Sequence, residues 1–383
     1  MSAPSRKLTE SSTSPTECRP YNQRNRAMNG DQTRFSLFTE GDELFESMLR
    51  DISSASKSIL FEVYIFRSDR VGQRFLDAFA GAAGRGVDVR ARLDAFGSWG
   101  TFPGSAHDAL RRAGVQLKWY GRWSWRHPFR YGRRDHRKLL VVDGEVAYLG
   151  GFNVGEESSR TSIGRTRWRD THLRFTGRLA SRAEQLFHDF EERRECGKEE
   201  WVDGSLLLPN YGVGCRYRWH CVLRQHLGEA TKRIWITTPY FVPDAATQRG
   251  LRNAALRGVD VRLLVPGKSD VSVVQWAARL SYESLLGAGV KVFEFGGRVL
   301  HAKTIVIDDD WASVGTSNLD YRSLFINDEL NLVTRSSRLN HELADVFLDD
   351  LEHAMRVVQK PRGKISLLRF AQGLIGWAAR KWL

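Results

Sequence analysis

The chain repeats itself, because four segments of its first half recur in its second half in the same order. The offsets between paired segments run from 165 to 175 residues, so the copies stay in register. An internal duplication limits the chain to two copies of one architecture. The pairs are Ile59–Asp69 with Ile234–Asp244, Arg85–Arg90 with Arg257–Arg262, Ala113–Leu117 with Ala288–Val292, and His136–Asp143 with His301–Asp308.

Each copy alternates β-branched runs with amphipathic stretches such as Gly72–Arg85 and Ala245–Arg257. This alternation is typical of an α/β fold with helices on both faces of a sheet. We therefore expect two homologous α/β domains that face each other across a pseudo-twofold axis, with the active site at their interface. The expected boundaries are a flexible arm at 1–33, domains at 34–197 and 211–355, a linker at 198–210, and a basic amphipathic helix at 356–383.

Composition narrows the class of partner. With 42% hydrophobic residues the chain can bury a core, which excludes a disordered or fibrous protein. The net charge of +13 indicates a polyanionic partner, either nucleic acid or an anionic membrane surface. No apolar stretch approaches the roughly 18–20 residues of a membrane span. The four cysteines, Cys18, Cys196, Cys215 and Cys221, are few and irregularly spaced, which predicts free thiols and a reducing compartment.

The fourth repeated segment carries the chemistry. Its first copy has His136 and Lys138 two positions apart, then four apolar residues, and its second has His301 and Lys303 in the same arrangement. Residues two apart share one face of an extended strand, so each His and Lys should project together. The motifs continue to Asp143 and Asp308, and then to Asn153 and to the pair Ser317 and Asn318. Two copies with this spacing are not typical of solvated surface residues.

The duplicated HxKxxxxD motif followed by Gly-x-x-Asn resembles the signature of the phospholipase D superfamily, and the likeness extends from about Phe35 to Asp350. Within that superfamily the chain is most similar to bacterial cardiolipin synthases, on the phrases GGFNVGEE, WRDTHLRFTG, TPYFVPD and WASVGTSNLDYRS. It resembles a short form in which a polar arm stands where many of those enzymes have N-terminal membrane helices. The resemblance implies two phospholipase D-like domains and a reaction through a phosphohistidine, with no cofactor and no metal.

Attack on a phosphodiester needs a nucleophile, a proton donor and positive charge around the phosphoryl oxygens. We expect His136 to be the nucleophile and His301 the acid and then the base, although a symmetric site leaves the reverse assignment open. Lys138 and Lys303 would hold the nonbridging oxygens. The amides Asn153 and Asn318, with the hydroxyl of Ser317, would donate further hydrogen bonds.

Carboxylates complete the expected site. In proteins that this chain resembles, an acid some thirty residues after each His anchors the far ring nitrogen, which implies Asp170 and Glu329 here; the alternative is a salt bridge at a strand start. Asp143 and Asp308 belong to the motif and are grouped with the catalytic residues. Both end apolar strands before turns, however, so pinning those turns is the favoured interpretation of the two.

Two stretches of sequence indicate which kind of partner the protein binds. Trp119–Arg134 interleaves arginines with aromatic residues, which suits a bilayer interface or stacked single-stranded nucleic acid. Pro361–Leu383 has an apolar helical face flanked by basic residues, as in an interfacial membrane helix. Either stretch could instead pack on the protein's own core. The residues expected to contact lipid are Trp123, Trp125, Arg126, Arg130, Leu374, Trp377 and Trp382.

The favoured function is a phosphatidyltransferase that passes a phosphatidyl group to phosphatidylglycerol and makes cardiolipin at the cytoplasmic face of a bacterial membrane. One alternative is hydrolysis by the same site, as in a phospholipase D or a nuclease; the amphipathic tail argues against nucleic acid as the partner. The other alternative is a non-catalytic membrane-binding protein, which the two intact motifs disfavour. The phosphatidyl donor, the acyl preference and the oligomeric state are not indicated by the sequence.

Overall fold

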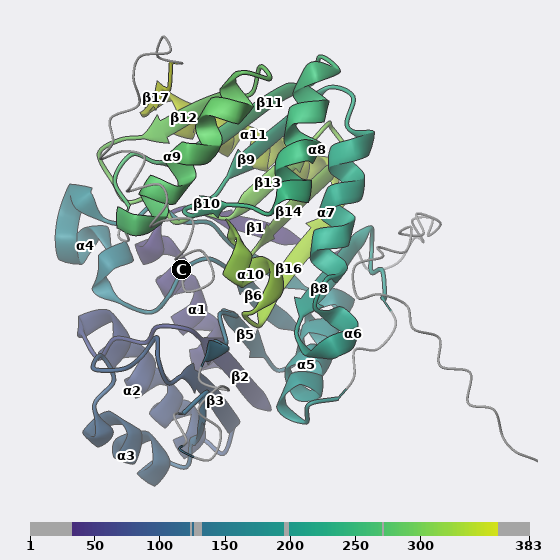
Figure 1. Cartoon of the computed structure of the whole chain (residues 1–383). Coiled ribbons are helices and arrows are strands. Elements are labelled where there is room, and N and C mark those ends of the chain that lie inside the picture. Colours follow the sequence, from purple (N-terminus) through teal and green to yellow (C-terminus); the bar gives the residue numbers. More distant parts are fainter. Residues whose placement is uncertain (1–32, 123–124, 126–131, 195–198, 270–271, 359–383) are drawn as a thin grey trace, which may run out of the picture.

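The computed structural model describes residues 33–122, 125, 132–194, 199–269 and 272–358, which form two sheets that pack face to face (Figure 1). Thr33 and residues 356–358 are described parts of the expected arm and C-terminal helix, and Arg356 ends the strand Ala354–Arg356 instead of beginning a helix; residues 1–32 and 359–383 lie outside the described residues. The first sheet has the order β1-β7-β6-β5-β2-β3-β4 and the second the order β17-β12-β11-β9-β13-β14-β16-β8. When the first sheet is followed from β4 to β1 and the second from β12 to β8, each strand of the first repeat has one counterpart in the second. The expected pair of α/β domains is therefore confirmed.

The first repeat contains seven strands, five helices and two short 3-10 turns among its described residues. The strands are β1 (Phe35–Phe38), β2 (Ser58–Val63), β3 (Asp88–Asp94), β4 (Gln116–Tyr120), β5 (Leu139–Val142), β6 (Val146–Gly150) and β7 (His172–Thr176). The helices are α1 (Gly41–Ser54), α2 (Arg70–Gly84), α3 (Gly104–Arg112), α4 (Arg160–Ile163) and α5 (Arg178–Glu191), with 3-10 turns at Glu156–Ser158 and Gly164–Thr166.

The second repeat follows the same plan with three additional strands, β10 and β15 in a two-stranded sheet and β17 at the edge of the large sheet. Its strands are β8 (Ser205–Asn210), β9 (Arg233–Thr237), β10 (Phe241–Val242), β11 (Asp260–Pro266), β12 (Lys291–Phe295), β13 (Thr304–Ile307), β14 (Trp311–Gly315), β15 (Leu319–Asp320), β16 (Glu329–Thr334) and β17 (Ala354–Arg356). Its helices are α6 (Gly212–Cys215), α7 (Arg218–Glu229), α8 (Ala245–Leu256), α9 (Ser272–Leu286), α10 (Tyr321–Phe325) and α11 (Ser337–Glu352).

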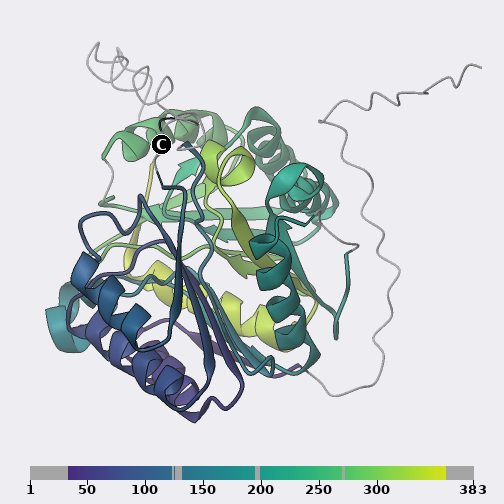
Figure 2. The same cartoon turned by 90° about the horizontal axis from the view of Figure 1, so that it is seen from below.

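Three apolar cores hold these layers together. Helices α1, α2 and α3 pack on the outer face of the first sheet, and α7, α8 and α9 on the outer face of the second. The third core lies between the sheets, where α5 and α11 pack with alternate residues of the central strands. The two halves consequently share one apolar interface, and Figure 2 shows them facing each other across it.

The repeats also use the same local signals. Asp69 caps α2 by accepting a hydrogen bond from a backbone N–H of its first turn, and Asp244 caps α8 in the same way. Strands β5 and β13 read LLVV and TIVI and are buried along their whole length. Strand β5 is antiparallel to β2 and β13 is antiparallel to β9, so the start of β5 or β13 lies beside the carboxyl end of its partner strand.

Two expectations about the chain between the repeats are wrong. Residues 205–210, which the sequence placed in a linker, form β8 and pair along their full length with β16, so the second sheet already begins there. Cys215 and Cys221 are each disulfide-bonded rather than free thiols. Irregular spacing along the chain does not report which sulfurs lie close in space. Among the described residues, none of the helices is long and apolar enough to cross a membrane.

Candidate active site

The two histidines lie at the starts of β5 and β13, and each is bonded through its backbone to the other repeat. The N–H of His136 donates to the carbonyl of Asp328 at 2.9 Å, and the N–H of His301 donates to the carbonyl of Arg169 at 2.7 Å. His136 is 7% exposed and His301 5% exposed. The candidate site is therefore assembled by docking of the two repeats, and neither repeat forms it alone.

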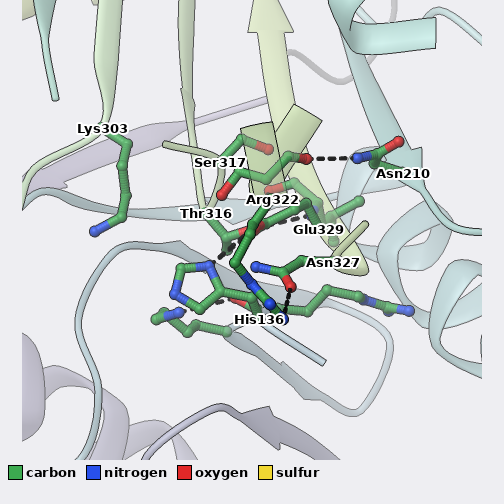
Figure 3. Close-up of polar contacts among 12 residues, drawn as sticks. His136, Asn210, Lys303, Thr316, Ser317, Arg322, Asn327 and Glu329 are labelled. Atoms are coloured by element: carbon green, nitrogen blue, oxygen red, sulfur yellow. Dashed lines mark hydrogen bonds and ion pairs between the residues drawn. The ribbon is translucent and has the colours of Figure 1, made fainter. Parts of the chain in front are cut away.

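Each imidazole is held by a carboxylate from the opposite repeat. Nδ1 of His136 lies 3.0 Å from Oε2 of Glu329, a contact that Figure 3 shows, and Nδ1 of His301 lies 2.5 Å from Oδ2 of Asp170. The family resemblance implied these two acids, some thirty residues after each His. It did not reveal that they exchange partners across the interface. Both contacts leave Nε2 as the ring atom that can react.

Both lysines are buried beside these rings. Lys138 is 2% exposed and donates from Nζ to the carbonyl of His136 at 2.8 Å. Nζ of Lys303 lies 2.9 Å from Nδ1 and 3.1 Å from Nε2 of His301, and Figure 3 shows its chain extending from the second sheet. Burial and the nearby Lys303 lower the pKa of Lys138 to about 7. Two ammonium groups thus share one poorly solvated space, which suits an anionic ligand.

The charges of the site also perturb the imidazole of His136. Burial lowers its pKa well below the usual value, and Lys138, Lys303 and His301 lower it further by repulsion. A ring in this position is neutral at pH 7. Residues of the second His–Lys pair thus act electrostatically on His136 of the first pair. The two pairs therefore belong to one site.

The two carboxylates differ in charge. Burial raises the pKa of Glu329 to about 7. Burial also acts on Asp170, but Lys303 and His301 outweigh it and hold the pKa of that carboxyl below its usual range. Asp170 is thus an anion at neutral pH, whereas Glu329 is close to half protonated. The duplicated site is electrostatically asymmetric.

One position of the Gly-x-x-Asn segments differs between the repeats and opposes this asymmetry, because a hydroxyl beside Glu329 lowers the pKa of that carboxyl. In the second repeat Thr316 donates from its hydroxyl to Oε2 of Glu329 at 2.6 Å. The corresponding residue of the first repeat is Gly151, where a Cβ would lie 2.0 Å from Oδ1 of Asp170. A side chain is accommodated beside one carboxylate and excluded beside the other. Sequence reasoning missed Thr316, although it stands inside a motif that was recognised.

The expected phosphate donors are all buried near the histidines. Oδ1 of Asn153 accepts a hydrogen bond from the backbone of Ile65 at 3.1 Å, which fixes the orientation of that amide. The hydroxyl of Ser317 accepts from Nδ2 of Asn331 at 2.6 Å. Oδ1 of Asn318 is buried without a hydrogen-bond partner. Asn331 was not expected from the sequence, because nothing in its local pattern distinguishes it from other strand residues.

Asp143 and Asp308 lie at the other end of β5 and β13 from the histidines. Asp143 accepts hydrogen bonds from the backbone N–H groups of residues 56–58, and Asp308 from those of residues 231–233. Both adopt left-handed backbone conformations, with φ of 55° and 48°. The geometry gives both aspartates a structural role in pinning the turns, which corrects their grouping with the catalytic residues.

Aromatic rings flank both imidazoles. The ring of Tyr64 lies edge-on to His136 with centroids 4.9 Å apart, and Trp168 lies 5.2 Å from His301. Of the residues expected to contact lipid, Trp125 is described and is 72% exposed. The others lie outside the described residues: Trp123, Arg126, Arg130, Leu374, Trp377 and Trp382.

The assembled groups can attack phosphorus, donate a proton and neutralise a phosphate. One neutral imidazole provides a nucleophile, and a second imidazole held by an ionised carboxylate provides a proton donor. Two buried lysines provide positive charge. In the described part of the chain, no group of three or more His, Cys, Asp or Glu side chains is arranged to hold a metal ion.

Comparisons with known proteins show the family to which the chain is similar. A family model described as "Cardiolipin synthase, PLD-like domain" matches residues 48–164 and 223–351. A cardiolipin synthase of Staphylococcus aureus strain Mu50 is 33% identical over 352 residues, which cover 88% of this chain and 71% of that protein. A cardiolipin synthase of Clostridium perfringens strain SM101 is 33% identical and covers 88% of this chain and 75% of its own length.

Solved structures with a similar fold have much lower sequence identity. The phosphatidylserine synthase of Haemophilus influenzae Rd KW20 superposes with a TM-score of 0.71 at 13% identity, covering 93% of this chain and 96% of that one. A polyphosphate kinase of Porphyromonas gingivalis superposes with a TM-score of 0.59 at 15% identity, covering 91% of this chain and 56% of that one. These two structures are evidence for the fold alone.

Proposed function

Because the chain belongs to the cardiolipin synthase family of phospholipase D-like proteins, we propose that it is a phosphatidyltransferase that makes cardiolipin. A phosphatidyl group would move from one phospholipid to a hydroxyl of phosphatidylglycerol. The observation that carries the proposal is the pair of His–carboxylate contacts formed across the repeats, with both lysines buried beside them. When phosphatidylglycerol is also the donor, the second product is glycerol.

In the first step Nε2 of His136 attacks phosphorus and displaces the headgroup oxygen. The low pKa of His136 supports this assignment, since the attacking nitrogen must be unprotonated. Glu329 would hold the ring proton on Nδ1. A P–N bond forms, a P–O bond breaks, and the proton of His301 passes to the leaving alkoxide.

His301 is suited to be the acid because the ionised Asp170 in contact with Nδ1 stabilises a protonated ring. Lys303 opposes that charge, since its ammonium touches both ring nitrogens. A substrate phosphate is a stronger partner for this ammonium and would draw it from the ring. Phosphate binding and protonation of His301 would therefore support each other.

In the second step a hydroxyl of phosphatidylglycerol attacks the phosphohistidine. His301, now neutral, takes the proton of that hydroxyl as general base. A new P–O bond forms, the P–N bond breaks, and His136 returns to its starting state. The position of His301 at the interface serves both the leaving and the entering oxygen.

We propose that this reaction needs no metal ion. Lys138 and Lys303 supply two positive charges beside the reacting phosphate, and the buried amides of Asn153 and Asn318 supply hydrogen bonds. We further propose that the protein works as a peripheral protein at the cytoplasmic face of a bacterial membrane, where phosphatidylglycerol would be both donor and acceptor.

The test is incubation of the purified protein with phosphatidylglycerol vesicles while cardiolipin, phosphatidic acid and glycerol are quantified. We expect cardiolipin and glycerol in equal amounts. His136→Asn, which preserves side-chain size, should abolish both products, and Glu145→Gln on the exposed surface should leave them unchanged. Phosphatidic acid without cardiolipin would make the protein a hydrolase, and absence of any product would contradict the proposal.

A further inference from the structure

One exposed turn carries two large aromatic side chains. The turn Asp94–Thr101 follows β3, and within it Phe96 is 43% and Trp99 80% exposed. Trp99 is the most exposed large apolar side chain in the part of the chain that the structure describes. Exposed tryptophan is costly in water and is characteristic of interfaces where one side of the ring meets apolar material.

The turn is held firmly from the inside. One carboxylate oxygen of Asp94 accepts hydrogen bonds from the N–H groups of Phe96 and Gly97, both at 2.9 Å. The hydroxyl of Ser98 donates to the carbonyl of Tyr64 at 3.1 Å. A Cβ at Gly97 would lie 2.3 Å from the same carbonyl, so the backbones are in close contact. The aromatic rings are therefore presented by a structured turn.

The same turn is bonded to the candidate active site. The second carboxylate oxygen of Asp94 accepts the N–H of Asp135 at 2.8 Å, and Asp135 directly precedes His136. Tyr64, against which the turn packs, lies edge-on to the His136 ring. The turn also follows the carboxyl end of β3, on the edge of the sheet where β5 begins. The aromatic tip and the expected nucleophile are therefore connected through one side chain, the carboxylate of Asp94.

One arginine lies against the tip, and the connection that carries it holds further exposed arginines. The guanidinium of Arg134 stacks on the ring of Phe96 at 3.8 Å from its centroid. Arg122 and Arg133 are exposed on the same connection between β4 and β5. Aromatic rings beside arginine match the headgroup region of an anionic bilayer.

We propose that the turn Asp94–Thr101 is a membrane-docking surface that inserts Phe96 and Trp99 into the headgroup region of an anionic bilayer. Arg133 and Arg134 would contact lipid phosphates, and the adjacent site would receive its phospholipid at the depth where headgroups lie. This inference rests on the proposed function for its choice of partner. The sequence pattern predicted lipid contact for other residues and did not indicate these two aromatics.

A second protein fits this surface less well than a bilayer. Two aromatic side chains bury roughly 300–500 Å² together, whereas a stable dimer needs about 1,200 Å² or more. A bilayer interface has no such minimum area. Basic residues around the tip would also repel a second copy of the same basic surface.

The test compares vesicle binding of the full-length protein with that of Trp99→Ser and Phe96→Ser. The control is Leu256→Ser, because Leu256 is 68% exposed at the last residue of α8, on the edge opposite the active site. Lipid is titrated with vesicles of phosphatidylglycerol and phosphatidylcholine, and binding is measured by flotation. We expect Trp99→Ser to lower the partition coefficient about tenfold and Leu256→Ser to leave it unchanged. Contributions of separate contacts multiply, so this ratio holds even where other segments bind.

Circular dichroism serves as the folding control. A second experiment measures cardiolipin formation from short-chain phosphatidylglycerol below its critical micelle concentration. There Trp99→Ser should match the wild type, because no bilayer is involved. Unchanged flotation of both serine variants would overturn the docking surface, even if cardiolipin is made. Light scattering tests for self-association of the protein. A molar mass that rises with protein concentration, and that no longer does so in Trp99→Ser, would overturn the docking surface in favour of a protein contact. Reduced flotation without any cardiolipin would refute the proposed function and leave the docking surface standing.

Discussion

Replacing Glu329 by glutamine should stabilise the protein at neutral pH while removing its activity. Glu329 is fully buried, and burial raises its pKa from the usual 4.5 to about 7. An increase of this size corresponds to about 3 kcal/mol of free energy that the ionised carboxylate costs the folded state. Glutamine has nearly the same shape and no charge, so the variant avoids this cost.

The sign of the pH dependence follows from proton binding. Between pH 4.5 and 7 the folded protein retains a proton on Glu329 that the unfolded chain has released. The free energy of unfolding of the wild type therefore falls as pH rises through this window, and the variant lacks this fall. We expect the variant to gain about 2–3 kcal/mol relative to the wild type between pH 5 and pH 8.

Activity should change in the opposite direction. A glutamine amide can donate to Nδ1 of His136 and so place the ring proton on Nε2, which blocks attack. Loss of the orienting carboxylate in a comparable His–carboxylate pair costs about 10⁴-fold in kcat. We expect a loss of about 10³-fold or more with little change in KM.

Urea denaturation at several pH values and a cardiolipin assay measure the two effects. Glu145→Gln provides the matched control, because the side chain of Glu145 is 72% exposed and its replacement should show neither effect. A stability difference between the Glu329 variant and the wild type that stays constant from pH 5 to 8 would refute the assigned protonation of Glu329. More than a tenth of the wild-type activity would refute its role in orienting His136.

Further predictions concern pH, the core and metal ions. The value of kcat/KM should have a narrow maximum near pH 7, because Glu329 is protonated below this pH and Lys138 loses its charge above it. Thr316→Val should move the acidic limb of the profile to higher pH, because it removes a hydrogen bond to the Glu329 carboxylate. A flat profile from pH 5 to 9 would contradict this. Arg137→Ala should lower the free energy of unfolding, measured by urea titration, by about 3–5 kcal/mol, because the fully buried Arg137 pairs with Glu62 at 2.8 Å. A loss below 1 kcal/mol would show that the pair contributes little. Activity should survive EDTA, and a strict requirement for added divalent metal would contradict the assignment of phosphate neutralisation to the lysines.

Much of the fold could be predicted because the duplication doubles every local signal. The β-branched runs before Asp143 and Asp308 recur, as do the caps Asp69 and Asp244, so each element is supported twice. The strand β8 was missed for the opposite reason. Its SLLLPN sequence lies between the repeats without a clear alternation, and its pairing with β16 is a long-range contact that local pattern does not report.

The sequence indicated which residues form the site better than it indicated which of them pair with one another. The repeated spacing indicated His136 and His301, and the resemblance to a known family implied Asp170 and Glu329. The exchange of Asp170 and Glu329 between repeats depends on how two folded units dock, which leaves no mark in the order of residues. The unequal charge of these carboxylates likewise arises from burial and from neighbours in the other repeat.

The central claim is that His136 becomes covalently bonded to the phosphatidyl group. The direct measurement is rapid acid or base quench of the protein with phospholipid labelled in its phosphate, followed by mass spectrometry of the modified peptide. The account predicts label on His136 alone, stable in base and lost in acid, and no label in His136→Asn. Label on His301 would reverse the assigned roles, and turnover without a labelled histidine in any quench would contradict the phosphohistidine mechanism.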